Sequence, residues 1–345
     1  MKILIVLTGG VGNALMFTPA LEILIKKYSP NNNEYFLLTS KLGADKILKE
    51  SGYFKEIFIY NHNSKFSFLI LFLKILFFKR FDVYISSMGL AQFKSGFLAI
   101  ASKARLRCAE SNYNFFFTHC VKPNWQLHEV ERNFEIVNQL TKIKKEEEAL
   151  QLKFYFNDRH LQETQKILNN LKMDLTDKML IGMHIGSNDF LDAKRWKIDN
   201  FKKLISKILD EYKNSVVILF GGKNEIEYSL QIEKQARIIN LVGKTSLPAA
   251  GLLIKRCKVF ISNDSGLMHL AVAAGIRIIA LFGPTIIEKN RPYHPNSIVL
   301  SKKLECSPCY KYNQKINCPR NYECMKSISV TEVFNELKKI MQSLE

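Results

Sequence analysis

Short apolar runs alternate with longer amphipathic segments along most of the chain. The runs are rich in Ile, Val, Leu and Phe, are bounded by polar turns, and have the length of buried parallel strands. Nine of them occupy residues 2–7, 34–39, 57–60, 83–86, 179–183, 216–220, 238–241, 259–261 and 276–282. The segments between them have helical spacing, so the pattern predicts an α/β protein with parallel sheets.

The strand candidates fall into two groups, which predicts two doubly wound domains. A chain of 345 residues is long enough for two domains, each with its own core. A charge run at 144–148 marks a solvated connection, and we expect the boundary between 145 and 178. We place the domains at 1–160 and 161–325, followed by an amphipathic helix in 326–345. Before that helix, Ser329 and Glu332 have the spacing of a capping box.

Residues 258–285 carry the strongest functional signal. They predict a buried strand, the polar turn Asn-Asp-Ser-Gly at 263–266, a helix and a second buried strand. The turn places a helix N-terminus at the carboxyl edge of the sheet, where open α/β sheets bind ligands and a helix favours phosphate. Asp264 or Ser265 alone fits a helix cap equally well. A second turn, Gly-Pro-Thr at 283–285, favours a phosphorylated ligand. His269, one helical turn after Ser265, favours the same ligand.

Two other turns are candidates for ligand contact. Gly-Gly-Val-Gly-Asn at 9–13 lacks the third glycine of a dinucleotide fingerprint, and no acidic residue ends the next strand, so we reject that function. These glycines either let the backbone approach a ligand or form a tight strand-to-helix turn. In the second domain, His-Ile-Gly-Ser-Asn at 184–188 precedes Lys-Arg-Trp at 194–196. Two cations and an indole at a sheet edge suit phosphate binding, and a solvated basic loop is the alternative.

The chain is strongly basic, with 50 Lys+Arg against 32 Asp+Glu and a net charge of +18. This excess favours nucleic acid, an anionic membrane surface or a phosphorylated substrate as partner. The lysines are dispersed and no recognition motif accompanies them, so nucleic acid ranks last. The most apolar segment, 66–78, is too short to span a bilayer. It predicts a buried helix covering a sheet, with an interfacial membrane helix as the alternative. With no signal peptide visible, we expect a cytoplasmic protein.

Four of the seven cysteines gather near the end of the chain: Cys306, Cys309, Cys318 and Cys324. The first two have the spacing of a zinc knuckle, but the second two do not. We therefore favour reduced structural thiols, which pack as small apolar groups, and keep zinc as the alternative.

Taken in order, these motifs resemble glycosyltransferase family 9, the ADP-heptose:lipopolysaccharide heptosyltransferases and their relatives. The similarity covers nearly the whole chain. It includes Gly-x-Gly-Asn-Ala-Leu-x-x-Thr-Pro-Ala-Leu at 10–21, Lys-Arg-Trp at 194–196, Phe-Gly-Gly-Lys-Asn-Glu at 220–225, Val-Gly-Lys-Thr-Ser-Leu at 242–247, Asn-Asp-Ser-Gly-Leu-Met-His-Leu-Ala at 263–271 and Phe-Gly-Pro-Thr at 282–285. The most specific part is Asp-Ser-Gly-x-x-His followed by Gly-Pro-Thr.

The resemblance implies a GT-B fold, in which two Rossmann-like domains face each other across a central cleft. It implies an inverting transfer of heptose from ADP-heptose to the inner core of lipopolysaccharide or lipooligosaccharide, without a cofactor or metal. The acceptor is an anionic, lipid-anchored oligosaccharide on the N-terminal domain, with Gly10, Gly12 and Asn13 in the acceptor-side loop. The expected location is cytoplasmic, with peripheral contact at the inner face of the inner membrane left open.

The donor site implied by the resemblance lies in the C-terminal domain. The predicted catalytic residues are Asn13 of the acceptor-side loop and Lys194 and Asp264 of the donor site, with Asp264 contacting the transferred sugar. The diphosphate would meet the start of the following helix, and Glu225 would hold the ribose. The full donor-binding set is Ser187, Lys194, Glu225, Thr245, Asp264, Ser265, Gly266 and His269.

One position departs from the family pattern. Many members have Asp where this chain has Asn13, and that Asp is thought to deprotonate the acceptor hydroxyl. A neutral amide cannot accept the proton, so the general base is unassigned. Asn13 then orients the acceptor while another carboxylate or the departing phosphate takes the proton. The alternatives are a catalytically impaired nucleotide-sugar-binding homologue and a transferase that uses another sugar nucleotide.

Overall fold

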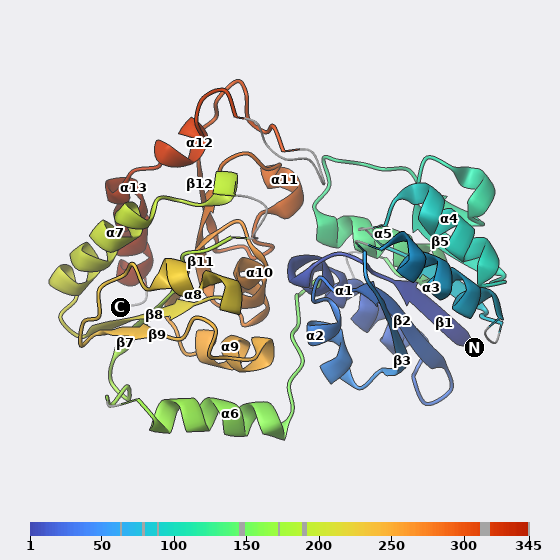
Figure 1. Cartoon of the computed structure of the whole chain (residues 1–345), viewed down its shortest axis with the longest axis horizontal. Helices are drawn as coiled ribbons and strands as arrows, with labels where there is room; N and C mark the ends of the chain where they lie inside the picture. The colour runs from blue at the N-terminus through green and yellow to red at the C-terminus, as the bar shows by residue number, and fades with distance from the viewer. Residues whose placement is uncertain are drawn as a thin grey trace. The chain divides into compact units, whose positions relative to one another are not determined.

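A computed structural model describes residues 1–62, 64–77, 80–87, 90–144, 149–171, 173–187, 192–310 and 318–343. The chain divides into two compact units, Met1–Tyr155 (unit 1) and Phe156–Glu345 (unit 2) (Figure 1). Asn188 and residues 145–148 of the expected charged connection lie outside the described residues. The predicted α/β class is confirmed, because each unit contains one parallel six-stranded sheet.

Unit 1 is built on a sheet whose strands run in the order β3-β2-β1-β4-β5-β6. The strands are β1 (Lys2–Val6), β2 (Glu34–Ser40), β3 (Phe54–Tyr60), β4 (Val83–Ser86), β5 (Leu106–Glu110) and β6 (His119–Val121). The helices are α1 (Val11–Lys27), α2 (Asp45–Leu48), η1 (Lys49–Ser51), α3 (Lys65–Phe77), α4 (Gln92–Ala101), η2 (Asn114–Phe116) and α5 (Glu129–Thr141).

The two faces of this sheet are covered by different helices. Side chains alternate along β1, and Leu4 and Val6 lie in one buried cluster with Leu71 and Ile75 of α3 and with residues of α4. Helices α1 and α5 pack against each other, with α5 also contacting β4, β5 and β6. Each helix therefore buries at least one side against the sheet or a neighbouring helix.

Unit 2 repeats the same strand order. Its sheet runs β12-β11-β10-β7-β8-β9, which becomes 3-2-1-4-5-6 when numbered from β7, as in unit 1 and in the Rossmann fold. The strands are β7 (Met179–His184), β8 (Ser215–Phe220), β9 (Ile238–Asn240), β10 (Val259–Asn263), β11 (Arg277–Phe282) and β12 (Ile298–Ser301). The helices are α6 (Asp158–Asn169), η4 (Asp192–Lys194), α7 (Ile198–Glu211), η5 (Lys223–Glu225), α8 (Ile226–Ser229), α9 (Leu247–Ile254), α10 (Gly266–Ala273), α11 (Ile287–Asn290), α12 (Glu323–Lys326) and α13 (Val330–Gln342).

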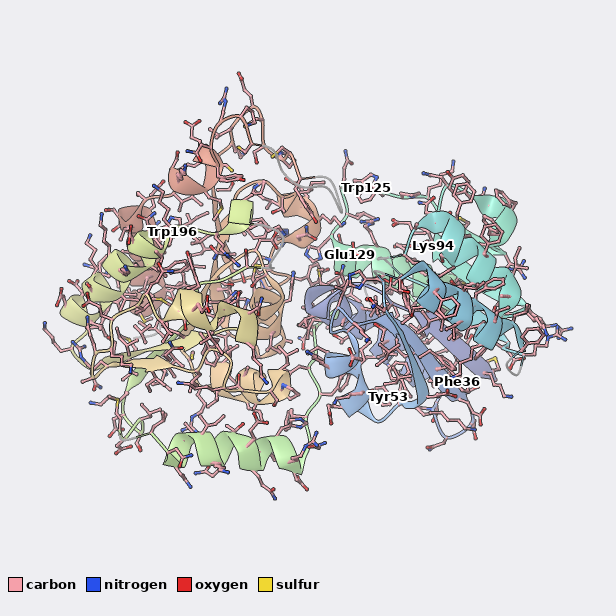
Figure 2. The ribbon with its side chains drawn as sticks, in the orientation of Figure 1. Phe36, Tyr53, Lys94, Trp125, Glu129 and Trp196 are labelled. Carbon is pink, nitrogen blue, oxygen red and sulfur yellow. The ribbon has the colours of Figure 1, made fainter. Side chains whose placement is uncertain are left out.

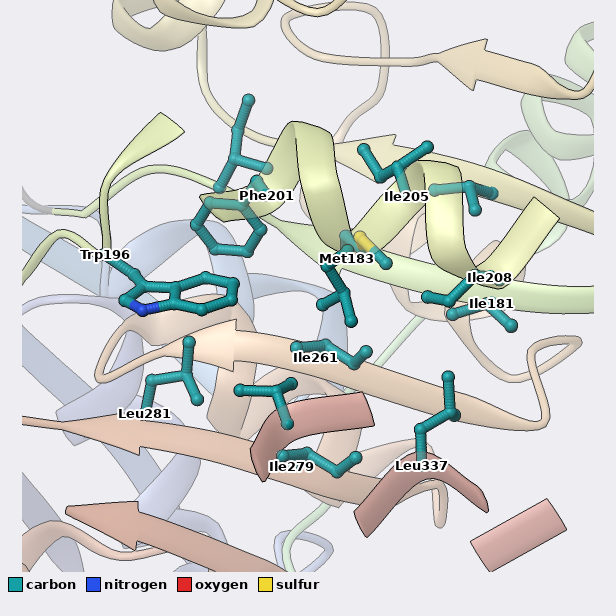
Figure 3. Close-up of a cluster of buried hydrophobic side chains, with 14 of the residues drawn as sticks. Ile181, Met183, Trp196, Phe201, Ile205, Ile208, Ile261, Ile279, Leu281 and Leu337 are labelled. Atoms are coloured by element: carbon teal, nitrogen blue, oxygen red, sulfur yellow. The ribbon is translucent and has the colours of Figure 1, made fainter. Parts of the chain in front are cut away.

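The core of unit 2 lies between the sheet and helices α7 and α13. Figure 3 shows Ile181, Ile261 and Ile279 from three neighbouring strands, facing side chains of both helices. Trp196 and Phe201 meet edge to face in this core, with ring centroids 5.0 Å apart. The predicted capping box before α13 is also present. The C-terminal helix is therefore part of this core.

All nine predicted strands are present, and the part of the chain that the structure describes contains three others that were not predicted. β5, β6 and β12 lack a continuous buried run, because their residues are largely exposed or half-buried. The predicted apolar helix is α3, but the expectation of a buried helix is only partly correct. Leu71 and Ile75 are buried, whereas Phe66 and Phe77 are exposed. No helix in the described ranges is both long and apolar enough to cross a membrane.

Candidate active site

The candidate site of unit 2 is at the carboxyl ends of β7 and β10. These strands pair in the middle of the sheet and are followed by helices on different sides, which makes this the switch point where open α/β sheets bind ligands. The predicted turn 263–266 follows β10, and residues 184–187 end and follow β7. Sheet pairing therefore brings together two of the polar turns identified in the sequence.

Lys194 and Asp264 form a largely buried ion pair, with 2.7 Å between Lys194 Nζ and Asp264 Oδ2. Burial opposes ionisation of the carboxyl group, but the Lys194 charge and hydrogen bond hold the pKa of Asp264 below its usual value, with smaller contributions from Thr285 and His269. Lys194 also lies 5.2 Å from the centre of the Tyr310 ring. The structure thus joins two of the three residues that the sequence analysis predicted to be catalytic, and the third, Asn13, belongs to unit 1.

Asn263 fixes the loop that carries Lys194. Its side-chain oxygen accepts a hydrogen bond from the backbone N–H of Trp196, and its amide nitrogen donates to the carbonyl oxygens of Ile185 and Gly186. The Trp196 indole is wholly buried and donates to the carbonyl oxygen of Ile328 at 2.8 Å. The suggestion that this indole helps to clamp phosphate is therefore wrong, because the ring anchors the loop to the core.

Ser265 is both a helix cap and a member of a polar network. Its hydroxyl oxygen accepts from the backbone N–H of Met268, as expected for the N-cap of α10. The same oxygen lies 2.9 Å from His184 Nδ1. On the other side of the ring, His184 Nε2 lies 3.0 and 3.1 Å from the two carboxylate oxygens of Glu225. The cap interpretation is correct, and it leaves the start of α10 directed at the same sheet edge.

Glu225 is buried and held in its ionised form. Burial raises the pKa of this carboxyl group, but His184, the Gly222 N–H and Arg195 together lower it below the usual value. The packing around the carboxylate is tight, because a Cβ at Gly186 would lie 1.6 Å from Glu225 Oε1. The sequence analysis placed His184 in a candidate turn at the end of a strand but left it out of the donor-binding set, which included Glu225.

The other predicted donor residues lie on the surrounding turns. His269 is buried in the first turns of α10, and Gly266 is the first residue of that helix. Ser187 is buried after β7, and its carbonyl oxygen accepts from the Arg195 guanidinium at 3.4 Å. Thr245 is half-buried in the turn between β9 and α9, one residue before the α9 N-cap.

Unit 1 has a corresponding turn after β1. Gly10 is the N-cap of α1, and Asn13 is the third residue of this helix, with Gly12 before it. A Cβ at Gly9 would lie 2.6 Å from the Asn13 side chain, so Gly9 is needed for the close approach. The acceptor-side assignment of this turn remains a prediction.

A buried ionic cluster, which the sequence analysis missed, lies at the ends of β5 and the start of α5. Arg132 pairs with Glu110 and, at 3.2 Å, with Glu129. Burial lowers the pKa of this guanidinium, but the two carboxylates raise it above its usual value. The ring of Trp125 covers Arg132 at 4.5 Å; Trp125 and Glu129 are labelled in Figure 2. Because β5 itself was not predicted, the sequence offered no signal that Glu110 ends a strand beside Arg132.

The C-terminal cysteines lie near the turn 283–285. The backbone N–H of Cys309 donates to the carbonyl oxygen of Pro284, and the Cys318 thiol accepts from the backbone N–H of Tyr322. Within the described ranges, no group of three or more His, Cys, Asp or Glu side chains is placed to hold a metal ion. The preference for structural thiols over zinc stays a prediction.

Comparisons with known proteins agree on one family. The model of "Glycosyltransferase family 9 (heptosyltransferase)" matches residues 72–319, more than half of the chain. Lipooligosaccharide heptosyltransferase 2 of Campylobacter jejuni serotype O:6 is 27% identical over 348 aligned residues, covering 99% of both chains. A family 9 glycosyltransferase structure from Veillonella parvula superposes with a TM-score of 0.80 at 20% identity, covering 99% of this chain and 97% of that one. An E. coli heptosyltransferase solved with ADP-2-deoxy-2-fluoro heptose superposes with a TM-score of 0.70 at 20% identity, covering 98% of this chain and 99% of that one.

Proposed function

Since the chain belongs to glycosyltransferase family 9, we propose that it is an inverting transferase that moves heptose from ADP-heptose to the inner core of lipopolysaccharide or lipooligosaccharide. The observation that carries this proposal is the Lys194–Asp264 ion pair beside the N-terminus of α10. The full-length relative named as a lipooligosaccharide heptosyltransferase supports the sugar and the acceptor. The E. coli structure with an ADP-heptose analogue supports the donor.

The proposed chemistry follows from where charge develops. As the bond from the anomeric carbon to the diphosphate breaks, negative charge grows on the leaving phosphate and positive charge on the sugar ring. The N–H groups at the start of α10 and the Lys194 ammonium stabilise the phosphate charge. Asp264, kept ionised by Lys194, faces the sugar. Ser187, Ser265, Gly266 and His269 complete the phosphate side, while Glu225 and Thr245 take the nucleoside.

The acceptor binds unit 1 in this proposal, with Gly10, Gly12 and Asn13 contacting it. Asn13 orients the attacking hydroxyl but cannot take its proton, because an amide has no basic site near neutral pH. Another carboxylate or the departing diphosphate therefore accepts the proton. The rival proposal, a binding protein without turnover, rests on the same residue.

The donor test compares thermal stabilisation of the full chain by ADP-heptose and by a panel of other nucleotide sugars. A ligand at 100 times its Kd stabilises by about 2.7 kcal/mol, so the correct donor gives a clear shift in melting temperature. Lys194→Met should abolish this shift, and Lys255→Met, an exposed lysine in the same unit, should retain it. Equal shifts in the two variants would overturn the donor site.

The turnover test uses ADP-heptose and a core oligosaccharide that lacks the added heptose. Heptosylated product supports the transferase, and donor binding without product supports the rival. Asn13→Asp separates the possible bases, because general-base catalysis contributes about a hundred- to ten-thousandfold. The pH dependence of kcat/KM is compared in the wild type and in Asn13→Asp. A fall in kcat/KM at low pH that occurs only in Asn13→Asp shows that position 13 can act as base. The same fall in the wild type indicates another carboxylate.

We also propose that the protein acts in the cytoplasm, in peripheral contact with the membrane that carries its lipid-anchored acceptor. The net charge of +18 supports this contact, since the cytoplasmic leaflet is negatively charged. Fractionation of cells into cytosol and inner membrane, with and without high salt, tests this location.

A further inference from the structure

Exposed apolar side chains are distributed unequally between the two units. Within the described residues, fourteen large apolar side chains are exposed in unit 1 and four in unit 2. Isolated exposed apolar residues are normal on a soluble protein, but a contiguous patch marks an interaction surface. The relevant question is therefore whether those of unit 1 lie together.

Helix α3 exposes a continuous apolar stripe. Phe66, Leu69, Ile70, Leu73 and Phe77 follow the i, i+3, i+4, i+7 spacing of one helix face, and all are exposed, Phe66 by 71% and Phe77 by 82%. A helix that only covers a sheet would have polar residues on this face. Helix α3 instead has apolar residues on both its buried and its exposed sides.

The neighbouring helix α4 continues the stripe. Helices α3 and α4 pack against each other, and α4 exposes Phe93, Phe97 and Ile100, again one helix face. Phe115, which follows α4 in the chain, is 69% exposed and its ring lies 4.1 Å from that of Phe116. We call the exposed apolar side chains of α3, α4 and Phe115 the aromatic surface of unit 1.

Lys and Arg side chains lie near this surface. Lys94 of α4 lies 5.2 Å from the ring of Phe68 on α3 (Figure 2 labels Lys94). Arg80 and Arg105 are exposed three and four residues after the last residues of α3 and α4. Lys74 pairs with Glu56, the acidic side chain that faces it from β3. Lys94, Arg80 and Arg105 therefore give this part of unit 1 a positive charge.

We propose that the aromatic surface of unit 1 docks onto an anionic lipid bilayer. Phe side chains insert between lipid headgroups, while Lys and Arg at the rim contact their phosphates. Burial of apolar area contributes about 25 cal/mol per Å², so several inserted Phe side chains and a few cations suffice for reversible binding. The proposal names the residues behind the membrane contact of the proposed function and therefore rests on it.

The surface lies on a bilayer and does not cross it. Helix α3 has 13 residues and is about 20 Å long, which is shorter than the roughly 30 Å hydrocarbon core. Charge distinguishes a bilayer from a second copy of the chain. Two copies joined through this surface would bring their cations together, whereas an anionic leaflet neutralises them.

The test is co-sedimentation of the full-length protein with vesicles of phosphatidylcholine alone or with 40% phosphatidylglycerol, a composition of roughly inner-leaflet charge. We expect binding to the anionic vesicles that is at least tenfold weaker in Phe66→Ser/Phe97→Ser. The matched control is Leu230→Ser, an apolar residue of unit 2 exposed by 63%. Lys94→Gln/Arg105→Gln should weaken binding and reduce its salt dependence, and Lys234→Gln/Lys255→Gln should do neither.

Three results would overturn the proposal: no wild-type binding to anionic vesicles, equal loss in Leu230→Ser, or a dimer in light scattering that the Phe variants disrupt without vesicle binding. Circular dichroism checks that the variants are folded. The transfer assay with a lipid-free core oligosaccharide separates this proposal from the proposed function. Normal transfer without vesicle binding refutes the docking surface alone, and vesicle binding without donor binding or transfer refutes the proposed function alone.

Discussion

Removal of the Lys194 charge should show how much the ion pair contributes to the unfolding free energy of unit 2. At 2.7 Å and an effective dielectric constant of about 20, the attraction between Lys194 and Asp264 is about 6 kcal/mol before desolvation. Breaking a buried pair costs about 3–5 kcal/mol, because one charge is left without its partner. We expect Lys194→Met to lower the unfolding free energy of unit 2 by about 3 kcal/mol and transfer by a hundredfold or more.

Urea unfolding followed by tryptophan fluorescence measures this loss. The chain has two tryptophans, so a Trp125→Phe background leaves Trp196 as the reporter of unit 2. Lys255→Met, an exposed lysine, is the control and should change the unfolding free energy by less than about 0.5 kcal/mol. The double variant Lys194→Met/Asp264→Asn should be more stable than the sum of its single changes by at least about 2 kcal/mol. Additivity within about 0.5 kcal/mol would refute a coupled pair.

The stability that Lys194→Met loses relative to the wild type should also depend on pH in a defined direction. In the wild type the folded pKa of Asp264 lies below its ordinary value of 3.8, so the pair stabilises at higher pH and its contribution is lost only as pH falls below that value. Without Lys194, burial raises the pKa of Asp264 in the folded protein, and the folded protein then loses stability as pH rises through this raised pKa. The deficit of Lys194→Met should be largest near neutral pH and narrow toward pH 4. A deficit independent of pH would contradict this account.

Three further variants test the supports of the site. Trp196→Phe keeps a ring in the core but removes the indole donor, so the unfolding free energy of unit 2 should fall by about 1–2 kcal/mol in urea. An unchanged urea midpoint would show that this hydrogen bond contributes nothing to stability. Gly9→Ala places a Cβ 2.6 Å from the Asn13 side chain; transfer should fall about a hundredfold while donor binding by calorimetry is unchanged, and wild-type transfer would remove Asn13 from the site. Glu225→Gln removes the charge facing His184, so donor affinity should weaken about tenfold, and equal affinity in calorimetry would argue against a donor role.

Much of the fold could be predicted because buried parallel strands have a clear sequence pattern. The run at 259–261 and the turn after it located β10, α10 and Asp264 together. β6 could not be found this way, since all three of its residues are half-buried and carry no run of apolar side chains.

The site residues were predictable where a motif named them, and less so where long-range contacts decide their roles. The position of Trp196 beside two cations suggested ligand contact, but its ring is buried in the core, where the carbonyl oxygen of Ile328, 132 residues away, accepts from the indole N–H. The link from Ser265 through His184 to Glu225 joins three separate turns. Such a network depends on strand order, which no single stretch of sequence contains.

The hydrogen bond from Trp196 to Ile328 has a consequence for the order in which the protein matures during synthesis. Unit 1 is complete at Tyr155 and can fold while the ribosome is still making the rest of the chain. The loop with Lys194 is made early in unit 2, but its anchor, Ile328, lies 132 residues after Trp196 in the chain. The proposed donor site is therefore complete only after Ile328 has been translated, and a chain truncated before Ile328 would have unit 1 folded without a finished donor site.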